Sequence, residues 1–209
     1  MRSYLLLVIG IIAVVVMTLI SSIAYPLVLE IGLKNKDAVL IASMLGEIAA
    51  FLLILPVVYS SSLRKLFKIE KAVKRGIALY LLCTFVMIFG GLLISAFFEV
   101  KYEPVFEEVS PIYAVAMLLL TAPVVEELIF RGLILHGLRD YAGDIIATVF
   151  SSLFFALLHY SSTPVLLLPV VFLDGFLLSY FVLKWGNLVP LIIAHTLINL
   201  QALLFYWLI

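Results

Sequence analysis

Long runs of apolar residues, separated by short polar segments, extend along the whole chain. A helix needs about 20 mostly apolar residues to cross the hydrocarbon core of a membrane. Several runs approach or exceed this length, and no tract shows the alternation of apolar and polar positions that is typical of β-barrel strands. The pattern predicts about seven membrane-spanning helices, at residues 4–31, 38–59, 76–98, 111–138, 144–160, 165–184 and 188–208.

The composition supports an all-α, polytopic membrane bundle. Of the 209 residues, 66% are hydrophobic and 12% are charged, and the mean hydropathy is +1.29. A soluble domain contains about 25% charged residues, so the lipid bilayer of the cell membrane is the expected surroundings. The formal net charge is zero, which gives no indication of a nucleic-acid partner. The first run is longer than the ~7–15 residues of a signal-peptide core, so we interpret it as a retained span.

The charged loops predict the orientation of the chain. Residues 61–75 contain six Lys and Arg residues and a single acid, whereas 99–110 is mostly acidic. Because basic loops stay in the cytoplasm, the N-terminus is expected to be cytoplasmic and 99–110 to lie on the opposite side. The basic segment could instead form a short amphipathic helix on anionic headgroups, but an ordinary loop is the favoured interpretation.

Ionisable side chains at membrane depth are the first candidates for function, because their insertion is costly. They gather in four of the later spans and one early span, and the set is Glu47, Glu126, Glu127, Arg131, His159, Asp174 and His195, with Asn199 beside them. The single cysteine, Cys83, allows no disulfide within one chain and is expected to face lipid or the core.

The segment "EELIFR" (126–131) places two acids and a base on one helix. At about 100° per residue, Arg131 lies ~40° from Glu127 and ~140° from Glu126. Glu127 and Arg131 therefore form a favourable i,i+4 pair, which leaves Glu126 free to face another partner. The alternative is that both acids satisfy the donors of Arg131.

Two further segments contribute polar groups at comparable depth. In "FALLH" (155–159), Phe155 and His159 share a helix face, and in "HTLIN" (195–199), His195 and Asn199 do so. Counted from the turns at 140–143 and 185–187, the distances along the helices are ~12–25 Å. A carboxylate, two imidazoles and an amide could thus meet in a buried polar chamber suited to activating water. The structural alternatives are that His159 is an interfacial residue and that His195 and Asn199 form interhelical hydrogen bonds that serve packing alone.

The three segments resemble the motifs of the CPBP family of CAAX proteases and bacteriocin-processing enzymes, also called the ABI family. "EELIFR" resembles EExxxR, "FALLH" resembles FxxxH and "HTLIN" resembles HxxxN, in the family's order, over about 111–200. The resemblance implies an intramembrane endopeptidase acting on membrane-associated substrates, which for some relatives are prenylated CAAX proteins. Residues 1–110 would then form N-terminal helices one to three, and 111–209 the catalytic core.

The resemblance also implies roles for the motif residues. Glu126 would be the catalytic glutamate and His159 its partner on the water. Burial disfavours the charged form of a carboxyl group, which suits it to accept and then return a proton near neutrality. Glu127 and Arg131 would be the supporting acid and base. His195 and Asn199 would hold or polarise the scissile carbonyl.

Metal dependence stays open at this point. Zinc or another divalent metal could be held by Glu126, His159 and His195, because two histidines and a glutamate form the ligand set of some zinc enzymes. A metal-free glutamate mechanism, with no cofactor, is favoured because HExxH is missing and asparagine is a poor zinc ligand.

Other functional classes remain as alternatives. A non-proteolytic immunity or scaffold protein of the same family could use the polar cluster for structure only. A transporter or proton relay is less favoured, because the sequence shows no repeated halves. The sequence predicts neither the substrate, the oligomeric state nor the roles of Glu47 and Asp174.

Overall fold

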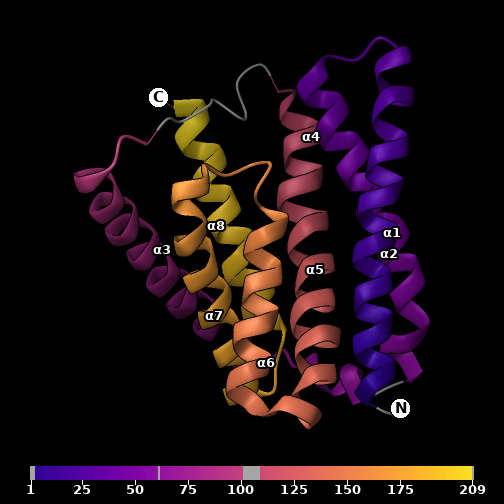
Figure 1. Ribbon diagram of the computed structural model, residues 1–209, viewed down its shortest axis with the longest axis vertical. Helices are drawn as coiled ribbons and strands as arrows, with labels where there is room; N and C mark the ends of the chain where they lie inside the picture. The colour runs from indigo at the N-terminus through magenta and orange to yellow at the C-terminus, as the bar shows by residue number, and fades with distance from the viewer. Residues whose placement is uncertain (1–2, 61, 101–108, 209) are drawn as a thin grey trace.

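The computed structural model of the protein describes residues 3–60, 62–100 and 109–208, which contain helices and no β-strand (Figure 1). The first half comprises α1 (Ser3–Glu30), α2 (Asn35–Ser60), the 3₁₀ helix η1 (Ser62–Leu66) and α3 (Ala72–Phe97). The second half comprises α4 (Pro111–Val115), the π-helix η2 (Ala116–Thr121), α5 (Ala122–Glu127), the π-helix η3 (Leu128–Leu135), α6 (His136–Leu158), the 3₁₀ helix η4 (Val165–Leu167), α7 (Leu168–Trp185) and α8 (Val189–Leu208).

The predicted all-α membrane bundle is confirmed. Among the described residues, five helices are long and apolar enough to cross a membrane, and 189–205 forms a shorter apolar helix. The longest, Pro111–Leu158, covers two of the predicted spans and bends at Gly143. The φ angle of Gly143 is 78°, a left-handed value that glycine adopts without steric cost. The turn expected at 140–143 is therefore present, and the count of seven spans is approximate.

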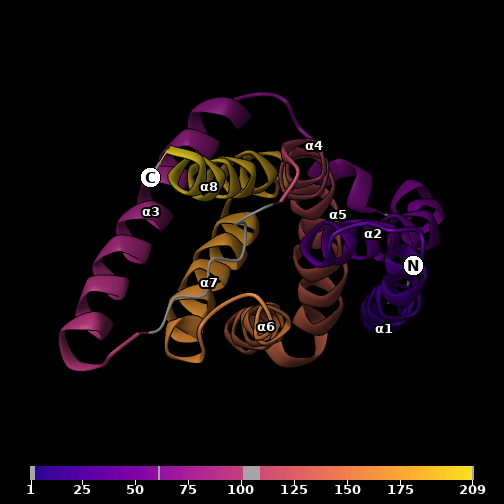
Figure 2. The ribbon, with the colours of Figure 1, turned by 90° about the horizontal axis from the view of Figure 1, so that it is seen from above.

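The first two long helices, α1 and α2, lie on one side of the molecule, and the third, α3, lies on the opposite side. Helices α1 and α2 pack against each other on one side, and α1 also packs against η3 and α6. Helix α3 lies on the other side, inclined against α8 and α7 (Figures 1 and 2). Helices α4 to α8 lie between them, so helices that carry no motif flank the motif-bearing segments on two sides.

The centre of the core is the π-helix η3, in which all eight residues are buried. Small residues let α1 approach it closely. A side chain at Gly10 would press against Ile134, and one at Gly137 would meet the backbone of Leu7. These contacts fix the segment that follows the two motif glutamates between α1 and the rest of the bundle.

The basic segment is tied to the turn between α7 and α8. The side-chain amide of Asn187, which is 1% exposed, donates to Lys68 O at 2.8 Å, and its Oδ1 accepts from Lys68 N at 3.2 Å. Leu188 N donates to Leu66 O at 2.7 Å. The segment forms the short helix η1 followed by an irregular stretch, rather than one continuous amphipathic helix. Of the acidic segment 99–110, residues 101–108 lie outside the described residues.

Candidate active site

Segments α5, η3, α6, α7 and α8 meet around one buried cation, Arg131. Arg131 Nη1 donates to Glu127 Oε1 at 3.0 Å, and both side chains are completely buried. The predicted i,i+4 pair is therefore present, although Arg131 lies within a π-helical segment. Arg131 Nη2 donates to Gly175 O at 3.1 Å, and the guanidinium carbon lies 4.3 Å from the centroid of the Phe155 ring.

His195 lies between the two consecutive glutamates. Its Nδ1 lies 3.0 Å from Glu127 Oε1, and its Nε2 lies 3.9 Å from Glu126 Oε2. A carboxylate bonded to Arg131 can only accept, so Nδ1 carries the proton of this hydrogen bond. The helix angles predicted that the two glutamates face different partners. In the structure they reach different nitrogens of the same imidazole.

Phe155 connects the two histidines. Its ring centroid lies 4.5 Å from that of His159 and 5.9 Å from that of His195. His159 directly follows α6, and its Nδ1 donates to Phe155 O at 2.8 Å, which leaves Nε2 available for another partner. The sequence placed Phe155 on the face of His159 but gave it no role. The first position of the FxxxH motif was the available signal.

Asn199 lies one helical turn beyond His195 and contacts a different element. Its side-chain Nδ2 donates to Leu118 O, in the π-helix η2, at 2.8 Å. A side-chain amide has two N–H groups, so this bond leaves one available for another acceptor. Asn199 thus fixes α8 against η2 and can still act as a donor.

Asp174, whose role the sequence did not predict, lies beside the buried charged groups of the site. Asp174 is buried, and the thiol of Cys83 and the side chains of Arg131 and His195 lie close enough to interact with its carboxyl. Cys83 is completely buried, which confirms core packing as one of its two expected positions. A Cβ on the neighbouring Gly175 would lie 3.2 Å from both Arg131 Nη2 and Phe155 Cδ1. The sequence suggested a close helix contact at Gly175, and in the structure the Arg131 side chain lies against this glycine.

Glu47 is a third glutamate beside the site. It lies on α2, which packs against α5 and η2, and it is 2% exposed. Its carboxyl interacts electrostatically with that of Glu126, and its Oε2 has no hydrogen-bond partner among the described residues. The sequence identified Glu47 as an outlier but did not predict that it lies close to Glu126.

The donor set gives no support to a metal centre. Among the described residues, no three His, Cys, Asp or Glu side chains are placed so that they could hold one ion. The Nδ1 atoms of both histidines are engaged, by Phe155 O and by Glu127, which leaves their Nε2 atoms available, so only the spacing of the side chains speaks against a shared ion. The possible ligand set of Glu126, His159 and His195 does not fit a three-ligand site in this arrangement.

Comparison with known protein families gives a match for the same part of the chain. Residues 108–201 match the family described as type II CAAX prenyl endopeptidase Rce1-like. The comparisons with curated proteins and with solved structures gave no match. The matched segment includes all three motifs and excludes α1, α2 and α3. Residues 108–201 are thus similar to the type II CAAX prenyl endopeptidase Rce1-like family, in agreement with the resemblance of the three motifs to the CPBP family.

Proposed function

We propose that the chain is an intramembrane endopeptidase that hydrolyses peptide bonds of membrane-associated substrates, including prenylated CAAX-type peptides, with water activated by Glu126 and His159. The observation that supports this most directly is the position of His195. One of its ring nitrogens is held by the Glu127–Arg131 pair, and the other faces Glu126 at 3.9 Å. The family match supports the general activity.

In the first step, Glu126 removes a proton from a water molecule, and the oxygen attacks the carbonyl carbon of the scissile peptide bond. The unprotonated Nε2 of His159 orients the water by accepting its second hydrogen. The electrons of the carbonyl double bond move to oxygen, giving a tetrahedral oxyanion. One well-placed donor to such an oxyanion contributes roughly 3–4 kcal/mol.

Asn199 and His195 are the donors proposed for the oxyanion. Asn199 has one N–H beyond the bond to Leu118 O. His195 donates from Nε2 only when its ring is doubly protonated, and in that form Nδ1 still donates to Glu127. A positive imidazolium facing the reaction centre would bind the oxyanion more strongly than it binds the neutral carbonyl, which is the requirement for catalysis.

In the second step, the tetrahedral intermediate collapses. The carbon–nitrogen bond breaks, and Glu126 returns its proton to the leaving nitrogen. The products are a carboxylic acid and an amine, and Glu126 is again a carboxylate. A metal ion takes part in no step of this scheme.

A cleavage assay on purified protein tests the proposal. The assay compares the wild type with Glu126→Gln, using a farnesylated CAAX-type peptide and a membrane-anchored peptide without prenyl group. We expect Glu126→Gln to lower kcat at least about 100-fold, because a general base contributes ~10²–10⁴-fold. Glu30→Gln, an exposed glutamate at the end of α1, is the matched control and should retain activity.

Two results would contradict the proposal. Undiminished cleavage by Glu126→Gln would exclude the assigned base. Intact peptides after incubation with well-folded wild type, across a panel of membrane-anchored sequences, would favour the immunity or scaffold alternative.

A further inference from the structure

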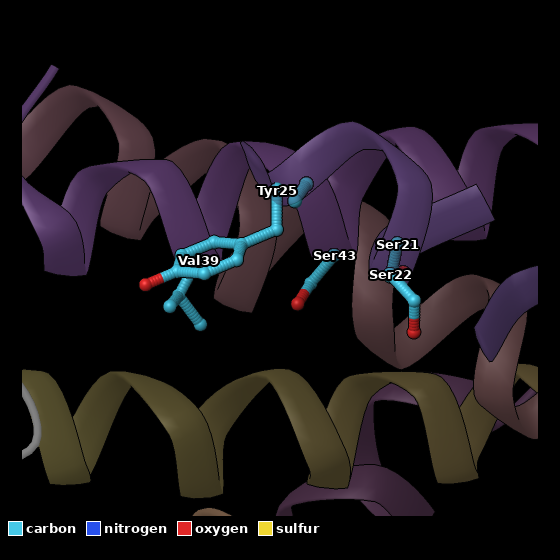
Figure 3. Close-up of a pocket in the computed structure, with 6 residues that line it drawn as sticks. Ser21, Ser22, Tyr25, Val39 and Ser43 are labelled. Carbon is cyan, nitrogen blue, oxygen red and sulfur yellow. The ribbon is translucent and has the colours of Figure 1, made fainter. Parts of the chain in front are cut away.

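A groove of about 250 Å³ lies along the α1–α2 pair (Figure 3). It lies outside the segment that matches the Rce1-like family and is not lined by any motif residue. The residues that line it are Ser21, Ser22 and Tyr25 from α1 and Val39, Ala42 and Ser43 from α2. Four of these six side chains carry a hydroxyl group, and those of Ser22 and Ser43 point away from the helix pair on the same side (Figure 3).

This lining differs from the rest of the surface of α1. Leu19, Ile23 and Leu27 of the same helix are 56%, 60% and 57% exposed, as expected for positions that face lipid. The hydroxyls of Ser21 and Ser22 donate to Met17 O and Thr18 O, and Tyr25 donates to Asn35 Oδ1. Their oxygen lone pairs can still accept hydrogen bonds, so the groove offers acceptors to a ligand that has N–H donors.

Glu47 does not line the groove, but it follows the lining residues along α2. Ser21 lies directly against Gly46, where a Cβ would meet the Ser21 hydroxyl and the carbonyl of Met17. Glu47 follows Gly46 and lies one helical turn beyond Ser43, about 6 Å along the axis of α2. The groove therefore extends along α2 from Val39 towards the glutamate that interacts with Glu126.

Glu47 is a second and independent sign of a ligand. It is buried, and no described residue supplies a hydrogen bond to its Oε2. A buried polar atom without a partner destabilises the protein, and more strongly when it is charged. A donor that arrives with a ligand would remove this cost, and the neighbouring catalytic glutamate indicates which ligand comes close.

We propose that the groove between α1 and α2 binds the peptide segment of the substrate next to the scissile bond, and that Glu47 accepts a hydrogen bond from a backbone amide of that segment. This proposal rests on the endopeptidase function and adds a binding site from helices outside the family match. A peptide backbone supplies an N–H at each residue other than proline. A prenyl or acyl chain supplies none, so it matches neither the hydroxyls nor Glu47.

The site is tested by binding to a catalytically inactive protein. Full-length Glu126→Gln is purified in detergent and exposed to a farnesylated CAAX-type peptide with a benzophenone side chain in the last three residues. Cross-links are expected on α1 and α2 near Ser43. Added Glu47→Leu or Ser43→Leu should weaken binding about 10-fold, the equivalent of one hydrogen bond of ~1.4 kcal/mol.

Two matched controls separate recognition from folding. Glu47→Gln retains an acceptor oxygen and should retain most of the binding that Glu47→Leu loses. Ser95→Leu places the same change on an exposed position of α3 and should bind as the parent does. In the active background, Ser43→Leu should raise KM with little change in kcat.

Three outcomes would overturn the proposal. These are wild-type binding by Glu47→Leu and Ser43→Leu, cross-links confined to α3 and α7, and competition for the groove by farnesylcysteine methyl ester alone, which would indicate a lipid site. Binding is measured on an inactive protein, so a failure of the cleavage experiment would not be mistaken for a failure of this one.

Discussion

The imidazole of His195 donates through Nδ1 to the same Glu127 oxygen that accepts from Arg131, and each distance is 3.0 Å. Glu127 thus has two partners, one on its own helical segment and one on α8. Arg131 fixes the position of the Glu127 carboxyl, and that carboxyl in turn fixes the orientation of the His195 ring. The pair that lowers the cost of charged residues in a membrane helix also orients His195, a residue of the proposed active site.

Replacing Arg131 alone should destabilise the protein strongly. Arg131→Met leaves Glu127 as a buried charge without its cation, which typically costs about 3–5 kcal/mol. The measurement is the free energy of unfolding in mixed micelles. Arg139→Met is the control, because Arg139 pairs with Asp144 at the surface, where such a bond contributes about 0–1 kcal/mol. Equal losses for the two variants would contradict the importance of the buried pair.

Replacing both members of the pair should separate stability from activity. The double variant Glu127→Leu/Arg131→Met leaves no uncompensated charge, so its stability should exceed that of Arg131→Met. His195 nevertheless loses its hydrogen-bond acceptor. We expect kcat to fall, by up to about 10⁴-fold, the loss seen when a catalytic histidine loses its orienting carboxylate. Recovery of both stability and kcat would show that Glu127 serves only Arg131.

Phe155 should matter for both histidines at once. Phe155→Leu removes the ring that lies against His159, His195 and Arg131. We expect a lower kcat and a loss of stability, because the smaller side chain leaves a cavity in the core. The adjacent Phe154 is 48% exposed and is the matched control. Cleavage by Phe155→Leu at the rate of Phe154→Leu would exclude the proposed role of the ring.

Gly175→Ala tests how tightly α7 packs on Arg131. The new methyl group would lie 3.2 Å from Arg131 Nη2 and from the Phe155 ring, so the guanidinium must shift. Overpacking of this kind costs about 1–3 kcal/mol and should also lower kcat. Gly91→Ala on α3 meets nothing within 4 Å and should be neutral or stabilising by up to about 1 kcal/mol, because alanine favours helices. A neutral Gly175→Ala in thermal unfolding would contradict the tight packing.

The elements and the motif pair followed from the sequence because both depend on local pattern. Apolar run lengths predicted the helices, and the spacing of Glu127 and Arg131 predicted their contact. The break at Gly143 lay where the sequence placed a turn. These features are decided by composition and by residues at most four positions apart.

The partners of His195, Glu47 and Asn199 depended on tertiary packing. Lipid-facing helices are apolar on nearly every face, so the pattern of a helix such as α2 does not show which neighbour it meets. The π-helical segments could not be predicted either, because an i→i+5 register leaves no strong mark in composition. The sequence did show Glu47 as an acid in an apolar run. Because Glu47 is far from the motifs in sequence, its nearness to Glu126 could not be predicted.

The separation of α2 from α3 has a consequence for biogenesis. The two helices are consecutive in the chain, yet α2 packs on α1, α5 and η2, whereas α3 packs on α8 and α7. During synthesis, α3 therefore lacks its packing partners α7 and α8, which begin more than 70 residues after it ends, until these have been translated. The hydrogen bonds between the Lys68 backbone and the Asn187 side chain likewise join the segment before α3 to the turn between α7 and α8. Assembly should thus be completed late, and a nascent chain that lacks α7 and α8 should leave α3 loosely held and open to quality-control proteases.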